Sequence, residues 1–122
     1  MLGKVWGGRY YAMDRDKRWD RVALAYAALV DGKGEHAADG RAAIEAGYAA
    51  GTTDEFVKPT AIGDYAGMKD GDGVLMGNFR ADRAREILAA LLAPEFDGFD
   101  RAPVVDFAAA LGLTEYSTAH SA

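Results

Sequence analysis

Two clusters of basic residues have the clearest chemical potential in this sequence. The first, GRYYAMDRDKRWDR, holds five cations and three acids between residues 9 and 21. The second lies within NFRADRARE, where three arginines accompany one acid between residues 80 and 85. The arginine guanidinium stays charged and can grip a carboxylate or a phosphate with two parallel hydrogen bonds. Both clusters are therefore candidate sites for a small anion.

The charge on the rest of the chain limits the size of that anion. The net charge is −5 and each cluster contributes +2, so the remainder must carry −9. Such a remainder would repel a long nucleic acid, whereas a small phosphorylated metabolite would meet only a local positive pocket. We therefore expect a phosphorylated metabolite as the partner, and no nucleic acid. An RNA-binding module that stacks bases on the arginines and tyrosines of residues 9–21 is a further alternative.

The second cluster falls at the predicted start of a helix. GVLMGNF followed at once by RADRAREILAALL predicts a strand leading into a helix over residues 80–93. Arg80 and Arg83 then share one face of the first turn, where a bound anion would offset their unfavourable position in the helix dipole. Alternatively, these arginines form a solvated, ion-paired face with Asp82 and Glu86. The spacing alone leaves both interpretations open.

The first cluster is predicted to follow a strand. Residues 4–12 are rich in strand formers, although Gly7 and Gly8 interrupt them and suggest a bulge or a close backbone approach. Alternation along this strand places Arg9 and Tyr11 on one side. Arg15 follows at the strand's end, where α/β sheets bind their ligands. The alternative is that Arg15 or Arg18 pairs with neighbouring acids, namely Asp14, Asp16 and Asp20.

The remaining sequence predicts one α/β unit with a mixed sheet and flanking helices. The further predicted elements are a helix capped by Asp16 and reaching about Val30, a loop from Gly32 to Ala38, a helix from Arg41 to Ala50 capped by Asp39, an extended segment from Phe56 to Ile62, a turn at residues 69–73 and a strand from Val74 to Phe79. The segment from Val104 to Leu113 suits either a helix or a strand.

Composition excludes several kinds of chemistry. The chain has no cysteine, so it can form neither a disulfide scaffold nor a thiolate site. Its longest apolar run is too short to span a bilayer, and we expect a cytoplasmic protein with no membrane partner. Two isolated histidines, His36 and His120, and two serines near the C-terminus, Ser117 and Ser121, make no catalytic constellation and no metal site. We expect no catalytic residue and no cofactor in this chain.

Five segments in a fixed order are more specific than either cluster alone. They are GRYYAMDRDKRWDRVALAYAALV, DEFVKPTAI, DGDGVLMGNFRADRARE, FDGFDR and LTEYSTA. In this order they closely resemble successive segments of the cofactor-independent (2,3-bisphosphoglycerate-independent) phosphoglycerate mutases. The resemblance runs from about Gly8 to the C-terminus and covers a minor central part of the family's full length.

The resemblance implies a part of a larger two-domain α/β enzyme of glycolysis and gluconeogenesis that interconverts 3-phosphoglycerate and 2-phosphoglycerate. An alkaline-phosphatase-like domain carries two manganese ions and a nucleophilic serine, and an inserted domain holds the substrate. Residues 1–122 would be a single partial domain, the C-terminal half of that insert. By resemblance, Arg9, Arg15, Arg80 and Arg83 bind the phosphoglycerate.

Two consequences follow for the chain by itself. Without the serine and the metal ligands it would bind substrate but be inactive, and the alternative is a stand-alone binding module for a small phosphorylated acid. The resemblance also favours a strand before LTEYS. Strands lacking their usual neighbours would present open edges, so we expect marginal stability or self-association through those edges.

Overall fold

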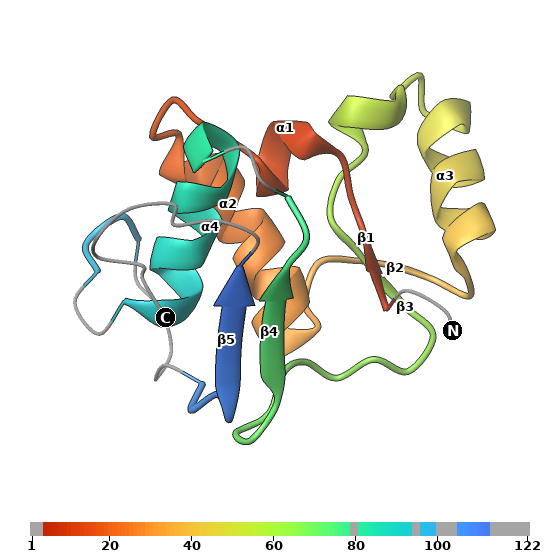
Figure 1. Ribbon diagram of the computed structural model, residues 1–122. Helices are drawn as coiled ribbons and strands as arrows, with labels where there is room; N and C mark the ends of the chain where they lie inside the picture. Colours follow the sequence, from red (N-terminus) through yellow and green to blue (C-terminus); the bar gives the residue numbers. More distant parts are fainter. Residues whose placement is uncertain (1–3, 79–80, 94–95, 100–104, 113–122) are drawn as a thin grey trace.

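The computed structural model describes residues 4–78, 81–93, 96–99 and 105–112, which form an α/β structure (Figure 1). The strands are β1 (Val5–Trp6), β2 (Glu35–Ala37), β3 (Thr60–Ile62), β4 (Gly73–Met76) and β5 (Ala109–Gly112). The α-helices are α1 (Arg9–Ala12), α2 (Trp19–Tyr26), α3 (Gly40–Ala49) and α4 (Ala81–Leu92). A π-helical turn, η1 (Ala27–Asp31), extends α2, and a 3-10 turn, η2 (Asp54–Phe56), precedes β3. The predicted fold class is confirmed.

The described strands form two separate sheets. In the first, β3 lies between β1, to which it is antiparallel, and β2, to which it is parallel. Every residue of β3 is buried, as expected for the central strand of a covered sheet. The second sheet is a parallel pair, β4 and β5, in which Leu75 lies opposite Leu111. These two leucines are 72% and 63% exposed, so this pair has an open apolar face.

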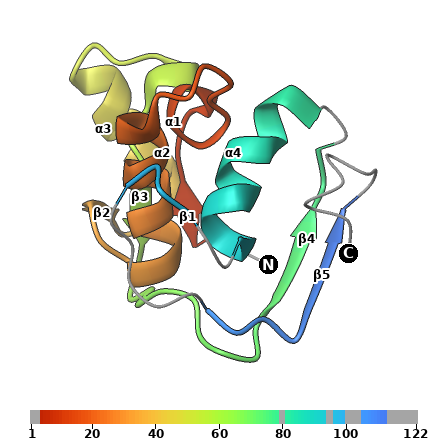
Figure 2. The ribbon, with the colours of Figure 1, turned by 90° about the vertical axis from the view of Figure 1, so that its left-hand side faces the viewer.

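The hydrophobic core lies mainly between α2 and α4. Both helices present an apolar stripe at helical spacing, and the stripes pack together. Its buried members are Val22, Ala25, Tyr26, Val30, Ile87, Ala90 and Leu91. Figure 2 shows α4 between the β4–β5 pair and the part of the molecule that holds α1 and α2. The packing of α4 on α2 therefore fixes where the start of α4 meets the N-terminal segment.

The predicted strand over residues 4–12 is wrong beyond Trp6. The chain turns at Gly8, whose N–H donates to the Val57 carbonyl at 2.8 Å, and α1 begins at the next residue. A side chain at Gly8 would stand 2.0 Å from the Glu55 carbonyl oxygen, so this close backbone approach requires glycine. Tertiary contact overrides the strand preference of the two tyrosines. The alternation argument for Arg9 therefore fails, since Arg9 is the first residue of a helix.

Two further predictions need correction. The predicted loop over residues 32–38 contains β2, because residues 35–37 find a partner in the buried strand β3. The predicted cap at Asp16 is also wrong: Arg18 occupies the N-cap of α2, and no side chain caps it. The predicted end of this helix is confirmed, because Gly32 follows η1 in the left-handed conformation with φ 65°.

The other helix and strand predictions hold, with shifted boundaries. Asp39 caps α3 as predicted, accepting the Ala42 N–H at 2.8 Å. The extended segment from Phe56 narrows to β3, since Phe56 itself belongs to η2. The strand choice for the last segment is confirmed by β5. Phe79, Arg80 and the two ends of the predicted segment 104–113 lie outside the described residues.

Candidate functional site

The two basic clusters meet where the loop between α1 and α2 lies against the start of α4. We call residues 13–18 the arginine loop. From α4, Arg83 donates through Nη1 to the Met13 carbonyl at 3.1 Å. From the loop, Arg15 donates through Nη1 to Asp82 Oδ2 at 3.3 Å. Side chains from clusters far apart in the sequence thus cross-link the same two elements, and Arg15 and Arg83 come to one place.

Asp14 organises the arginine loop from inside. Its side chain is almost fully buried, and Oδ2 accepts the backbone N–H groups of Asp16 at 3.1 Å and Arg18 at 2.9 Å. Its other oxygen receives Nη1 of Arg21 at 3.4 Å. Arg21 in turn lies over the Tyr10 ring, 3.8 Å from the centroid. One cation of the first cluster is therefore committed to the scaffold and is not free for a ligand.

Glu86 approaches the same loop from α4. It is 8% exposed, and Oε2 accepts the Lys17 N–H at 3.1 Å. Lys17 has φ 55°, a left-handed conformation that is unusual for a residue other than glycine. Glu86 Oε1 is buried and has no hydrogen-bond donor in the described part of the chain. Glu86 thus holds the arginine loop at Lys17, where the backbone is strained. Only one of the two carboxyl oxygens of Glu86 accepts a hydrogen bond from the described residues.

The two buried carboxyl groups shift each other's protonation. Burial, and then a hydrogen bond with Asp14, raise the pKa of Glu86 to about 7. Burial alone would raise the pKa of Asp14 too, but hydrogen bonds with Glu86 and with the backbone of Arg18 and Asp16 lower it below its usual value. Below about pH 7 the pair therefore holds one proton, and Glu86 is the residue that carries it.

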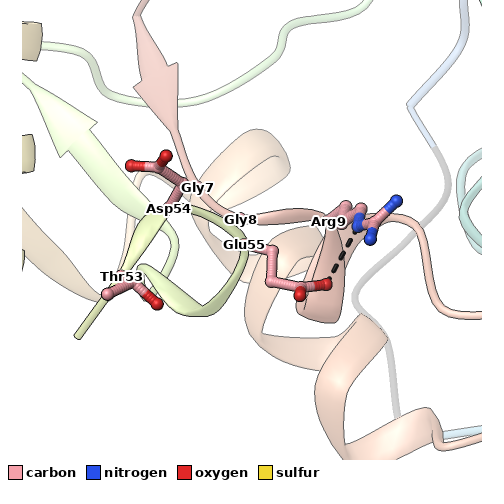
Figure 3. Close-up of a pocket in the computed structure, with 6 residues that line it drawn as sticks. All are labelled: Gly7, Gly8, Arg9, Thr53, Asp54 and Glu55. Atoms are coloured by element: carbon pink, nitrogen blue, oxygen red, sulfur yellow. Dashed lines mark hydrogen bonds and ion pairs between the residues drawn. The ribbon is translucent and has the colours of Figure 1, made fainter.

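Arg9 lies at a different place, beside η2. Its Nε donates to Glu55 Oε2 at 2.9 Å, and both side chains are largely exposed. An open, polar pocket lies here, with Arg9 and Glu55 at one end (Figure 3). Its lining residues are Gly7, Gly8, Arg9, Thr53, Asp54 and Glu55. Among the described residues, the Arg9 side chain makes no hydrogen bond or ion pair with the arginine loop, and only its backbone carbonyl accepts the Met13 N–H at 2.9 Å.

The predicted alternatives to ligand binding are realised only in part. Arg18 pairs with Asp20 at 3.5 Å, as the ion-pair alternative predicted. Arg15 instead pairs across to Asp82 in α4, and Arg83 uses a backbone carbonyl. The fourth candidate, Arg80, lies outside the described residues. Whether the four arginines bind substrate stays a prediction.

The roles of Asp14 and Glu86 were not predicted from the sequence. Both were treated as ordinary acids that could pair with neighbouring arginines, whereas both are buried. A signal was available for Glu86, since it immediately precedes the apolar stripe of α4 at Ile87 and lies one turn after Arg83. For Asp14 the local sequence gives no such signal.

The residues that the structure describes offer no site for the manganese ions that the resemblance implies. No group of three or more potential ligand side chains gathers among them. His36 lies exposed in β2, while Ser117, His120 and Ser121 lie outside the described residues. We therefore assign no step through a metal to these residues. No described helix combines the length and apolar character that crossing a membrane requires.

Comparison with known proteins gives one consistent family. The family model described as "BPG-independent PGAM N-terminus" matches residues 4–118. The chain is 61% identical over 113 residues to the 2,3-bisphosphoglycerate-independent phosphoglycerate mutase of Dinoroseobacter shibae, covering 93% of this chain and 22% of that protein. It is 62% identical over 112 residues to the enzyme of the same name from Rhodopseudomonas palustris, covering 92% of this chain and 22% of that protein.

A solved structure agrees with these sequence relatives. A crystal structure of Leishmania mexicana phosphoglycerate mutase, determined at low cobalt concentration, superposes with a TM-score of 0.75 and 32% identity. The match covers 87% of this chain and 21% of that chain. The chain thus spans about a fifth of the length of the relatives it matches. With the family model matching nearly all of its residues, the chain belongs to the 2,3-bisphosphoglycerate-independent phosphoglycerate mutase family.

Proposed function

We propose that this chain is the substrate-holding part of a cofactor-independent phosphoglycerate mutase that interconverts 3-phosphoglycerate and 2-phosphoglycerate. One observation carries the proposal: Arg15 and Arg83, from two clusters distant in sequence, meet at the arginine loop. The family relationship supports a phosphoglycerate as the substrate, and the convergence of the two arginines supports the arginine loop as part of its binding site. Arg9 and Arg80 complete the set of arginines that the resemblance implies.

The contacts of Arg15 suit a group that exchanges partners. Its ion pair with Asp82 is largely exposed, and exposed pairs contribute only about 0–1 kcal/mol. A phosphoglycerate offers a phosphate and a carboxylate, both of which match the guanidinium fork better than a single carboxylate oxygen at 3.3 Å. We therefore expect the substrate to displace Asp82 from Arg15 at little energetic cost.

Arg83 is held more firmly and suits a fixed anchor. Its Nη1 is engaged by the Met13 carbonyl, and its Nε is buried without a partner in the described part of the chain. A buried guanidinium that keeps unused donors favours an anionic acceptor, since unpaired buried donors are costly. Arg83 would orient the substrate while Arg15 closes on it.

In this proposal the chain binds and orients, and the chemistry belongs elsewhere in the enzyme. The phosphatase-like domain implied by the resemblance would supply the metal ions and the serine that takes up the phosphoryl group. Several fixed cations around a small, multiply charged acid favour such a transfer, because they keep glycerate in place while it reorients. We expect the chain alone to bind 3-phosphoglycerate and to show no mutase activity.

The test is calorimetric titration of this chain with 3-phosphoglycerate. Arg83→Ala and Arg15→Ala should each weaken binding by about tenfold or more, because each removes a charge-assisted contact. Arg41→Ala is the matched control, since Arg41 is exposed on α3 and, among the residues that the structure describes, pairs with Glu45 of its own helix alone. Because Arg83 is part-buried, circular dichroism of each variant must first show a folded chain. Equal affinity in all four proteins, or no binding by the wild type, would overturn the proposal.

A further inference from the structure

The carboxyl pair of Asp14 and Glu86 has no role in the proposed substrate contacts, yet it lies directly behind them. Asp14 belongs to the arginine loop next to Arg15, and Glu86 lies one turn after Arg83 in α4. Both residues are buried, with exposed fractions of 3% for Asp14 and 8% for Glu86. A buried pair of acids between the two elements that carry the candidate arginines calls for a physical explanation.

Counting donors at the pair shows where a proton must lie. Asp14 receives two backbone N–H groups and Arg21, so as a carboxylate it is well supplied with donors. Glu86 receives only the Lys17 N–H on Oε2, and its buried Oε1 receives none in the described part of the chain. An ionised Glu86 would therefore have too few hydrogen-bond donors for its two oxygens, and it would lie next to the negative charge of Asp14. A proton on Glu86 would remove this like-charge repulsion and give the carboxyl group a donor that Asp14 can accept.

The charges around the pair agree with this assignment. On the arginine loop, Asp14 and Asp16 both act against a negative charge on Glu86. On α2, Arg21 faces Asp14 and favours the ionised form of that acid. On α4 itself, Arg83 is turned to the Met13 carbonyl. The pKa of Glu86, raised to about 7 chiefly by burial, is consistent with a carboxyl group that is protonated below neutral pH and ionises around pH 7.

We infer that Glu86 is a positioning residue, whose protonated carboxyl group donates to Asp14 and fastens the arginine loop to α4, so that Arg15 is held opposite Arg83. In this fastening Oε2 of Glu86 accepts the Lys17 N–H, as observed, and the proton on the same carboxyl group would be donated to Asp14. Loss of the proton replaces the second bond with repulsion between two buried carboxylates. The loop should then loosen from α4, and the two arginines should lose their alignment.

The linkage between the loop and α4 is independent of any ligand, but its consequence for binding rests on the proposed function. We therefore separate the two in the experiment. The variant is Glu86→Gln, whose amide can still donate to Asp14 and accept from Lys17 but does not titrate. The first measurement follows the Glu86 carboxyl carbon by NMR in the wild-type chain from pH 4 to pH 9. We expect a midpoint well above the ordinary value of 4.5.

The second measurement compares hydrogen exchange of the Lys17 amide in both proteins across the same pH range. After correction for the intrinsic pH dependence of exchange, protection should fall in the wild type as Glu86 ionises and stay constant in Glu86→Gln. A Glu86 midpoint near 4.5, or the same protection profile in both proteins, would overturn the inference. Neither measurement uses a ligand, so both decide it even if the proposed function is wrong.

The third measurement is the affinity for 3-phosphoglycerate at pH 6 and pH 8.5. The ligand's own titration is common to both proteins, so the informative quantity is the ratio of their affinities. We expect the wild type to weaken relative to Glu86→Gln by roughly three- to tenfold between these pH values, a coupling of the usual size. A constant ratio, with binding intact, would show that Glu86 does not position the arginines. Absence of binding in both proteins would overturn the proposed function. The inference about Glu86 would then be decided by the first two measurements alone, since they use no ligand.

Discussion

Two regions of this molecule place an arginine beside a carboxylate, with different surroundings. In the Arg9 region, the ion pair with Glu55 joins side chains that are 55% and 43% exposed. In the arginine loop, Arg21 meets Asp14, whose side chain is 2% exposed, within a network that includes two backbone N–H groups and Glu86. The chemical groups are the same, but only the second pair is shielded from water.

The difference separates two functions of charge in one small domain. An exposed pair gains little energy, so its partners can be exchanged for a ligand at low cost. A buried, fully hydrogen-bonded carboxylate is costly to disturb, so it fixes the backbone around it. We therefore expect the buried network to control stability and the exposed pairs to control which anions bind.

The largest expected effect comes from removing the centre of the buried network. Asp14→Ala leaves the Asp16 and Arg18 N–H groups and Arg21 without their acceptor, and should lower the free energy of unfolding by about 3 kcal/mol. Urea denaturation measures this. Asp20→Ala is the control from the same segment, because Asp20 is exposed and, within the described part of the chain, forms an ion pair with Arg18 alone. Similar losses in both variants would show that burial does not distinguish the two kinds of pair.

The second largest effect is expected at Gly8, next to Arg9. It tests whether the exposed Arg9 region also contains a backbone position that cannot accommodate a side chain. Gly8→Ala places a methyl group 2.0 Å from the Glu55 carbonyl oxygen, which is backbone and cannot move aside freely. We expect a loss of about 2–3 kcal/mol, as for other overpacked sites. Gly77→Ala is the matched control, since no atom of the described residues, its two chain neighbours aside, lies within 4 Å of the added methyl group. Thermal unfolding of the two variants should separate clearly, and a stable Gly8→Ala variant would contradict the observed approach.

The third effect is a dependence of stability on pH, and it tests the protonation of Glu86 in the buried pair with Asp14. The pKa of Glu86 is raised in the folded chain, so its stabilising effect is complete at low pH and is lost as pH rises from 4.5 toward about 7. Glu86→Gln does not titrate. Between pH 5 and pH 8 the wild type should therefore lose roughly 1–3 kcal/mol of stability relative to the variant. Parallel stability curves for the two proteins would mean that Glu86 ionises normally.

The smallest effect belongs to the exposed pair itself. Glu55→Ala should change the free energy of unfolding by less than about 1 kcal/mol, since water solvates both partners of this pair. The change should shrink further in high salt, which screens exposed charges. Urea denaturation at low and high salt checks both statements. A loss as large as that of Asp14→Ala would abolish the distinction drawn between the two regions.

Local signals in the sequence were sufficient for the longer helices. Asp39 before an alanine-rich segment and Gly32 after a periodic one correctly mark helix ends, because capping acts within a few residues. The short element α1 could not be found this way. It depends on Gly8 fitting against the backbone of η2, which lies far along the chain. The same holds for β2, whose partner strand follows it by a long connection.

The residues of the candidate site likewise fall into those that the sequence identifies and those that depend on tertiary packing. The four arginines were found from charge clustering and from resemblance, and two of them, Arg15 and Arg83, do come to one place. Asp14 and Glu86 were missed because burial of an acid is a property of the packed structure. The predicted self-association through open edges stays a prediction, with the exposed pair of Leu75 and Leu111 as the surface to examine.

The way the strands pair has a consequence for how quickly the chain acquires this structure. In register, Glu35 lies opposite Thr60, Gly73 opposite Ala109, and Val5 opposite Ala61, so the partners are 25, 36 and 56 positions apart. No strand of the described residues pairs with a neighbour across a tight hairpin turn. Each pairing must close a long loop before it gains any contact energy. Refolding should therefore be slow for a protein of this length, and partly collapsed chains should persist during it, with their apolar strands available to other molecules.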